Sequence, residues 1–329
     1  MKSSLLKWLC CPRCCADLRI AAADGVATSL DQGSLGCLGC RGEYPIVDGI
    51  PRFVSSDNYS TSFGFQWNRF RRTQLDSQSG LPISRDRFFA QSGWTPEELR
   101  GSRVLDVGCG AGRFAEVALS CGAQVVALDY SQAVDACRAN LEGVEALEVV
   151  QGDIYHLPFR KGRFDFVYCF GVLQHTPDVD AAFRALPEQV KPGGRLAVDV
   201  YPRLAVNALL PRYWLRPLTR RIPPERLFPI VERALRFLYP LSTLLARTPL
   251  VGRKLRHLLP VANYAGVFPL SEAQLREWSL LDTFDMLSPA HDHPRSAGEV
   301  RRWFEAAGFE AIEVLRPGHL VGRGRRPRG

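Results

Sequence analysis

Four cysteines near the start of the chain have the spacing of metal ligands. They form two C-x-x-C pairs with 22 residues between them, and such pairs can surround one Zn²⁺ ion tetrahedrally. Since four thiolates leave no open coordination position, we expect a structural ion rather than a catalytic one. Cys10 and Cys15 lie beside the first pair, so either of them could in principle replace one of its two ligands. The predicted ligands, which alone have the two-residue spacing, are Cys11, Cys14, Cys37 and Cys40.

A second group of residues combines glycines with acids carried on strands. Residues 104–107 have the apolar pattern of a buried parallel strand that includes Asp106, and glycines follow at 108, 110 and 112. Glycines let the backbone approach a ligand closely, and a helix that begins near 112 would present its N-terminus there. Asp129, at the end of the next apolar strand, can accept both ribose hydroxyls of an adenosine. By themselves these features fit a nicotinamide dinucleotide as well as another adenosyl cofactor.

Further motifs follow in order and narrow the choice of cofactor. They are Gly152-Asp153 with Leu157-Pro158-Phe159, a loop at 171–178 after a strand at 164–170, and Lys191-Pro192-Gly193-Gly194 before a strand at 195–200. With Arg113 in place of the third glycine of a dinucleotide fingerprint, the set resembles the class I S-adenosylmethionine (SAM) methyltransferases, type 11-like. A dehydrogenase would explain only the glycine turn and Asp129. The resemblance implies an α/β fold with a Rossmann-like seven-stranded sheet, SAM as cofactor and S-adenosylhomocysteine as product.

The resemblance also implies which residues hold the cofactor. The glycine turn and Asp106 would receive the methionine half of SAM, Asp153 would accept the adenine amino group, and Ile154 would pack on the ring. The predicted cofactor-binding residues are Asp106, Gly108, Cys109, Gly110, Asp129, Tyr130, Asp153, Ile154 and Phe170.

Three histidines are candidates for the general base. SAM brings its own leaving group, so the enzyme mainly aligns the acceptor and, where this is a hydroxyl, removes its proton. His175 follows the strand at 164–170 and is the first candidate. His291 or His293 could act instead, the latter oriented by Asp292, and each histidine could also be an ordinary polar contact. The further candidates for the pocket are Asp199 and Tyr201.

The elements that must position these residues divide the chain into four parts. We predict a zinc ribbon at 1–54, a linker with helices at 55–100, the methyltransferase core at 101–200 plus 296–323, and a mainly helical insertion at 201–295. The cysteine pairs with the run from Tyr44 to Pro51 resemble the small zinc-ribbon activator subunit of some tRNA and protein methyltransferases.

Other segments of the chain give less specific expectations. We expect the stretch at 85–99 to be helical, with a helix start at Thr95-Pro96-Glu97-Glu98, and the tail from Arg323 is expected to be disordered. The aromatic segment at 63–70 either covers the SAM pocket or packs its rings on the core.

The predicted insertion carries most of the positive charge. Within 203–256, twelve arginines and lysines against two glutamates give +10, which exceeds the +8 of the whole chain. Nine prolines between positions 202 and 260 lead us to expect short helices. Basic, leucine-rich helices fit an anionic membrane surface somewhat better than nucleic acid, and a solvated cap over the substrate is a third possibility.

Composition and charge limit the function further. A hydrophobic content of 46% with 23% charged residues is typical of a globular protein, and no run approaches the roughly 18 apolar residues of a spanning helix. We expect a cytoplasmic enzyme, with peripheral contact to the inner membrane face as one option. The predicted activity is SAM-dependent methyl transfer to an O or N atom of a small molecule, sugar or lipid-linked glycan. The alternatives are an RNA methyltransferase, acting on tRNA or rRNA, and a non-catalytic adaptor with a SAM-binding fold.

Overall fold

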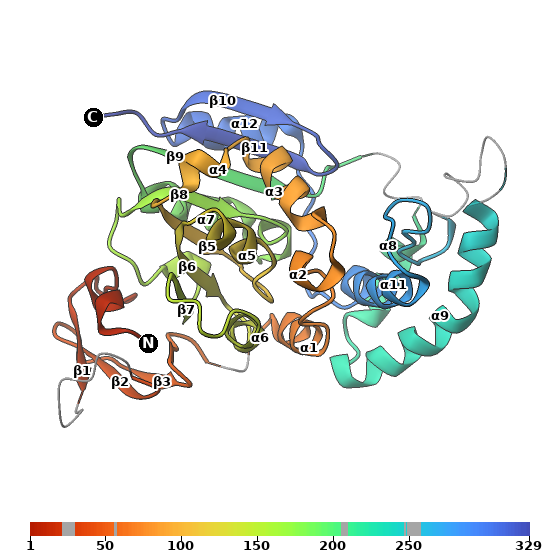
Figure 1. Ribbon diagram of the computed structural model, residues 1–329, viewed down its shortest axis with the longest axis horizontal. Helices are drawn as coiled ribbons and strands as arrows, with labels where there is room; N and C mark the ends of the chain where they lie inside the picture. The colour runs from red at the N-terminus through yellow and green to blue at the C-terminus, as the bar shows by residue number, and fades with distance from the viewer. Residues whose placement is uncertain (22–29, 56–57, 205–209, 247, 249–257) are drawn as a thin grey trace.

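Three structural parts are seen in the chain. The computed structural model describes residues 1–21, 30–55, 58–204, 210–246, 248 and 258–329. Figure 1 shows a small N-terminal sheet, a larger sheet covered by helices, and a group of helices on the side away from the small sheet.

The N-terminal part is a four-stranded antiparallel sheet with the strands in chain order. It contains the 3-10 helix η1 (Ser3–Lys7) and strands β1 (Leu18–Ala21), β2 (Gln32–Cys37), β3 (Glu43–Val47) and β4 (Ile50–Pro51). Its apolar residues belong to the same core cluster as the larger sheet. Leu9 forms a β-bridge with Phe159, and Arg52 forms one with Gln151, so the small sheet is fixed to one edge of the large one.

The larger sheet has seven strands in the order β10-β11-β9-β8-β5-β6-β7. The strands are β5 (Arg103–Val107), β6 (Gln124–Asp129), β7 (Leu147–Gln151), β8 (Phe164–Cys169), β9 (Val190–Val200), β10 (Glu310–Leu315) and β11 (Leu320–Arg325). β11 runs in the direction opposite to that of the other six strands, which are parallel to one another. This arrangement confirms the predicted fold class. β5 lies in the sheet interior, so the glycine turn that follows it opens at the carboxyl edge of the parallel strands.

Alternate strand residues supply two cores, one on each face of the sheet. Leu105 and Val107 pack on the face covered by α7 (Val179–Ala185) and α12 (Ala297–Ala306). Val104 packs on the opposite face, with residues of α5 (Arg113–Ser120) and α6 (Ala133–Asn140). Short 3-10 turns complete the connections: η2 (Ile154–His156), η3 (Leu173–His175) and η4 (Pro187–Gln189).

The tail prediction is wrong for its first residues. β11 continues to Arg325, and the backbone N–H of Arg326 donates to the carbonyl of Gly194 at 2.8 Å. The basic residues here are ordered because their backbone completes the hydrogen bonding of β9.

Four helices precede the first strand of the large sheet: α1 (Thr61–Arg69), α2 (Asp76–Ser79), α3 (Ile83–Ser92) and α4 (Pro96–Leu99). The predicted helical stretch at 85–99 is therefore two helices, and the predicted start at Thr95 is confirmed. Gly93, with φ 67°, ends α3, and a capping box between Thr95 and Glu98 begins α4.

Between β9 and α12 the chain forms α8 (Pro211–Thr219), α9 (Pro224–Ala246) and α11 (Glu272–Leu287). The expectation of short helices is wrong for α9, which has 23 residues with Pro229 and Pro240 inside it. Each proline removes one backbone hydrogen bond, but the buried side of α9 packs with apolar residues of α11 and offsets that loss. Figure 1 shows α9 as a long curved helix. No helix in the described parts of the chain is long and apolar enough to cross a bilayer.

Candidate functional site

The four predicted metal ligands lie together. Each of Cys11, Cys14, Cys37 and Cys40 offers a sulfur atom, and all four sulfurs lie within 4.8 Å of one another. The Sγ atoms of Cys14 and Cys37 are 3.4 Å apart, and those of Cys11 and Cys40 are 3.6 Å apart. Four thiolates about 2.3 Å from one Zn²⁺ would be separated by about 3.8 Å, so the cluster fits that ion.

Two neighbouring cysteines stand apart from this cluster. Cys10 is buried, its backbone N–H donates to the carbonyl of Pro158 at 3.0 Å, and burial raises the pKa of its thiol to about 11. Its sulfur is not one of the four that lie together. Cys15 is exposed, with a backbone φ of 60° that turns the chain out of the first pair.

The glycine turn after β5 is closely covered by side chains from two other segments. Gly108 has φ 85°, and a Cβ atom placed there would lie 2.1 Å from Val172 in the loop after β8. Gly110 has φ 51°, and a Cβ atom there would lie 3.3 Å from Trp67 of α1. Both positions favour glycine because of their positive φ, and at Gly108 the contact with Val172 also leaves no space for a side chain.

Asp129 holds this turn in place. Its Oδ2 accepts the backbone N–H of Gly110 at 2.9 Å, and its Oδ1 accepts both the N–H and the hydroxyl of Ser131, at 2.8 and 2.7 Å. Burial raises the pKa of Asp129, while these hydrogen bonds act in the opposite direction. The carboxylate thus connects the end of β6 to the turn after β5.

Asp106 lies in the middle of β5 with no counter-charge. It is 2% exposed and lies beside the hydroxyl of Tyr168 on the neighbouring strand, and neither that hydroxyl nor Oδ2 of Asp106 has another hydrogen-bond partner among the described residues. Burial raises the pKa of Asp106 to about 8. A buried acid with no cationic partner among the described residues, beside a glycine turn, fits a ligand that brings a positive charge, as the ammonium group of SAM would.

The other predicted cofactor-binding residues lie at or just after the carboxyl ends of β5 to β8. Cys109 and Ile154 are buried, and Asp153 caps η2 by accepting the N–H of Tyr155 at 2.9 Å. The ring of Tyr130 lies 4.9 Å from that of Tyr59. Phe170 stacks on Tyr168, at 5.2 Å, and is buried in the core on the side of α5.

The predicted histidines are brought together across 116 positions of sequence. His175 is buried, and its Nδ1 lies 3.0 Å from the backbone carbonyl of His291. A carbonyl only accepts, so Nδ1 of the neutral ring carries the hydrogen, and Nε2 keeps its lone pair. The backbone N–H of His293 donates to the carbonyl of Gln174 at 2.8 Å and fixes the same loop.

The expected orientation of His293 by Asp292 is not seen. The carboxylate of Asp292 lies 3.5 Å from the guanidinium of Arg216, with both side chains buried, and it makes no hydrogen bond to a histidine among the described residues. Burial lowers the pKa of both His291 and His293.

The two remaining candidates differ in their contacts. Asp199 is fully buried and already occupied: it accepts from Arg87 at 2.9 Å, from Gln91 at 2.8 Å and from the backbone N–H of Gly171. Tyr201 lies between two histidine rings, 5.5 Å from His175 and 5.8 Å from His319. Burial lowers the pKa of His319 to about 4, so this ring is neutral at pH 7.

Helix α1 lies across this site. Phe63 and Trp67 are four residues apart and so share one face of the helix; Phe63 lies 5.1 Å from the ring of His175, and Trp67 lies on Gly110. Phe65 instead packs on the insertion, 5.8 Å from Phe228. The segment therefore does both things considered for it, covering the glycine turn and packing on apolar residues. The sequence signal was the concentration of aromatic residues, without an indication of which ring goes where.

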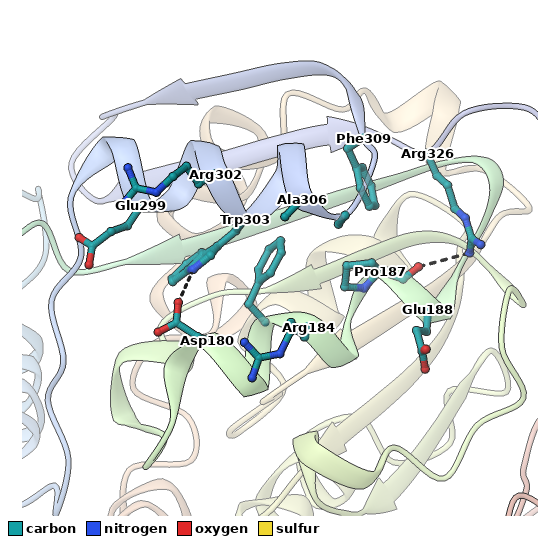
Figure 2. A pocket seen from close by; sticks show the side chains of 12 residues that line it. Asp180, Arg184, Pro187, Glu188, Glu299, Arg302, Trp303, Ala306, Phe309 and Arg326 are labelled. Atoms are coloured by element: carbon teal, nitrogen blue, oxygen red, sulfur yellow. Dashed lines mark hydrogen bonds between the residues drawn. The ribbon is translucent and has the colours of Figure 1, made fainter.

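A cavity of about 690 Å³ lies away from this site, on the face of the sheet covered by α7 and α12 (Figure 2). Figure 2 shows Trp303 donating to Asp180 on one side of it, at 2.6 Å. None of the predicted site residues lines this cavity.

The central part of the chain is similar to known methyltransferases. Residues 105–198 match the family model for a methyltransferase domain. A ubiquinone biosynthesis O-methyltransferase of Xanthomonas euvesicatoria pv. vesicatoria is 41% identical over 109 residues, which are 32% of this chain and 46% of the relative. The sterol 24-C-methyltransferase erg6 of Schizosaccharomyces pombe is 32% identical over 151 residues, 43% of this chain and 37% of the relative. The chain thus spans about half the length, or less, of these curated relatives.

Solved structures are similar at a lower level. A chain from a complex that contains the Haloferax volcanii Trm112 methyltransferase activator has a TM-score of 0.45 and 15% identity, covering 80% of this chain and 97% of that one. The magnesium protoporphyrin IX methyltransferase (ChlM) of Synechocystis PCC 6803, with bound S-adenosylhomocysteine, has a TM-score of 0.43 and 18% identity, covering 82% and 96%. Likenesses at this level add nothing to the strand order described above.

Proposed function

We propose that this protein is a SAM-dependent methyltransferase that methylates a hydroxyl oxygen of a small or lipid-linked molecule. The observation that carries the proposal is the contact between two loops of the matched domain. Val172 lies against Gly108, and the backbone N–H of His175 donates to the carbonyl of Val172 at 2.8 Å. A histidine whose Nε2 has no hydrogen-bond partner among the described residues is therefore attached directly to the segment that covers the glycine turn.

The residues around the turn fit SAM as the cofactor. Gly108 and Gly110 would receive its methionine part, the buried carboxyl of Asp106, which has no cationic partner among the described residues, would compensate its positive charge, and Asp129 would accept from the ribose. When bound, SAM supplies an activated methyl group and leaves as S-adenosylhomocysteine.

His175 is the proposed general base. The carbonyl of His291 holds the hydrogen on Nδ1, so Nε2 can accept the proton of an acceptor hydroxyl while the ring stays fixed. His291 and His293 act as positioning residues through their backbone groups. Phe63 and Trp67 exclude water from the space between the glycine turn and His175.

The acceptor we favour has an apolar body. Aromatic rings of Phe63 and Tyr201 flank His175, which suits an apolar molecule presenting one hydroxyl. The names of the two curated relatives refer to ubiquinone biosynthesis and to a sterol, and both support this choice. A sugar carried on a lipid is compatible with the same arrangement.

The N-terminal part is proposed as a structural zinc domain, residues 1–54, that stabilises the β7 edge of the large sheet. Arg52 donates from its side chain to Gln151 at 2.9 Å and pairs with Asp135 at 2.7 Å. An edge strand that is covered in this way is protected from unwanted pairing. Its likeness to a methyltransferase activator subunit remains a prediction.

The test uses the purified, zinc-loaded protein. Calorimetry with SAM and with S-adenosylhomocysteine measures cofactor binding, and radiolabelled SAM with fractionated lipids, glycans, small metabolites and RNA identifies the acceptor. The proposal expects binding of both ligands and label in a lipid or small-molecule fraction. Label in RNA alone would assign the RNA activity instead, and binding with no label in any fraction would favour the non-catalytic adaptor.

A further inference from the structure

Helix α9 is apolar on two opposite sides. One side packs in the core of the insertion and contains Leu227, Phe228, Val231, Leu235 and Tyr239, all buried. The other side carries four large apolar residues that face solvent. They are Ile230, 56% exposed, Phe237, 75% exposed, Leu241, 44% exposed, and Leu244, 64% exposed.

The exposed apolar residues and two arginines form one stripe. At 3.6 residues per turn, the positions fall within a sector of about 80° around the helix axis. In chain order the stripe is Arg226, Ile230, Arg233, Phe237, Leu241 and Leu244. We refer to these six residues as the α9 stripe.

Exposed apolar residues are concentrated in this region of the protein. Of the eleven large hydrophobic side chains that are exposed in the described parts of the chain, nine lie between Trp214 and Val267. A contiguous exposed apolar surface on a folded protein usually marks an interaction site. The concentration of exposed hydrophobic side chains on this one insertion therefore indicates a binding surface for a partner.

The charge around the stripe selects the partner. Residues 210–246 contain seven arginines and two glutamates, a net charge of +5. Arg226, Arg233 and Arg236 form no ion pair with a described residue and are all exposed. Cationic side chains beside exposed leucines and a phenylalanine complement a surface that is both anionic and apolar. Aliphatic residues add little to nucleic-acid binding, which uses aromatic stacking and phosphate contacts.

We propose that the α9 stripe docks on an anionic phospholipid bilayer. Phe237, Leu241 and Leu244 enter the boundary between headgroups and acyl chains, and Arg226 and Arg233 contact the lipid phosphates. The buried side of α9 contacts α1 through Phe228 and Phe65, so the membrane lies one helix away from the segment that covers His175. The role of this contact rests on the proposed function: an acceptor carried by a lipid would reach the site without leaving the bilayer.

The experiment measures sedimentation of the full-length, zinc-loaded protein with vesicles. One set of vesicles contains phosphatidylcholine alone, and the other contains about one third phosphatidylglycerol. The apolar variant is Phe237→Ser with Leu241→Ser, and the charge variant is Arg226→Glu with Arg233→Glu. Matched controls remove an exposed apolar residue and an unpaired exposed arginine elsewhere, as Val144→Ser and Arg184→Glu.

The proposal expects binding to the anionic vesicles that falls by about tenfold or more in each stripe variant and stays within about twofold in each control. Binding that is equal for both vesicle types, or unaffected by the stripe variants, overturns it. The proposal is also overturned if the stripe variants lose RNA binding or dimer formation but still bind the vesicles. Calorimetry with SAM on the same samples shows that each variant is folded. SAM binding without vesicle binding would contradict the membrane proposal alone, whereas vesicle binding without SAM binding would contradict the methyltransferase assignment alone.

Discussion

The backbone N–H of Gly110 donates a hydrogen bond of 2.9 Å to the carboxylate of Asp129, nineteen residues later. With the two bonds from Ser131, three of the about four acceptor sites of this carboxylate are used within the protein. About one acceptor site is left for a ligand. Asp129 can therefore accept one ribose hydroxyl rather than the two that were predicted. Asp129 therefore shapes the glycine turn as well as facing the ligand.

The first prediction concerns His175. Replacement by Asn keeps a donor for the carbonyl of His291 but removes the acceptor at Nε2, so we expect kcat to fall by about 10²- to 10⁴-fold while the Kd for SAM is unchanged. His156→Asn, at an exposed histidine in η2, is the control and should keep full activity. Full activity of the His175 variant would exclude this residue as the base.

The second prediction concerns the close cover of the glycine turn. Gly108→Ala combines an unfavourable positive φ with a collision against Val172, so it should lower Tm and weaken SAM binding. Gly143→Ala is the matched control, because Gly143 has φ 78° with nothing within 4 Å of its Cβ position, and it measures the conformational cost alone. The difference between the two should shrink when Val172→Ala is added to the first. If both variants lose the same stability, the collision has no effect.

The third prediction concerns the metal. Cys40→Ala, or treatment with a chelator, should remove bound zinc and lower Tm, because the small sheet has little core of its own apart from its contacts with the β7 edge. Cys15→Ala should leave the zinc content of the protein unchanged, since the thiol lies outside the cluster. Zinc content by atomic absorption and Tm by calorimetry provide the two measurements. Retention of zinc by the Cys40 variant would contradict the four-ligand assignment.

The fourth prediction concerns the buried acid of β5. The pKa of Asp106 is about 8 in the folded protein and near 3.8 when unfolded, so between these values the folded state holds a proton that the unfolded state has lost. Stability from this group therefore falls as pH rises from about 4 to about 8. Asp106→Asn removes that dependence, and its Tm relative to the parent should increase by several degrees between pH 5 and pH 8. A constant difference in Tm would contradict the raised pKa, and the same variant should bind SAM more weakly.

The fifth prediction separates the two rings of α1. Trp67→Ala should mainly raise the KM for SAM, because Trp67 lies on Gly110, whereas Phe63→Ala should mainly raise the KM for the acceptor, because Phe63 lies on His175. Gln66, between them, is buried and donates to Asp285 at 2.9 Å, so α1 stays attached to the insertion in both variants. Equal effects of both variants on both KM values would indicate a general loosening of α1.

Several features of the protein could be predicted from neighbouring residues alone. The two C-x-x-C pairs and the glycine turn depend on spacing over a few positions, where local geometry limits the outcome. The end of α3 at Gly93 was not predicted, whereas the helix start at Thr95 was. The length of α9 was missed because its two prolines were weighed without the apolar contacts that offset them.

The sequence by itself determined the metal cluster, because the spacing of the four cysteines is local, and it indicated the seven-stranded α/β fold through the resemblance of its motifs to the class I SAM methyltransferases. Only the tertiary structure decided which ring nitrogen of His175 is free, because its partner is a backbone carbonyl 116 residues away. It likewise decided that Asp292 pairs with Arg216, and that one side of α9 is left uncovered. Such outcomes depend on which distant surfaces meet when the chain folds, and no short pattern of residues records that.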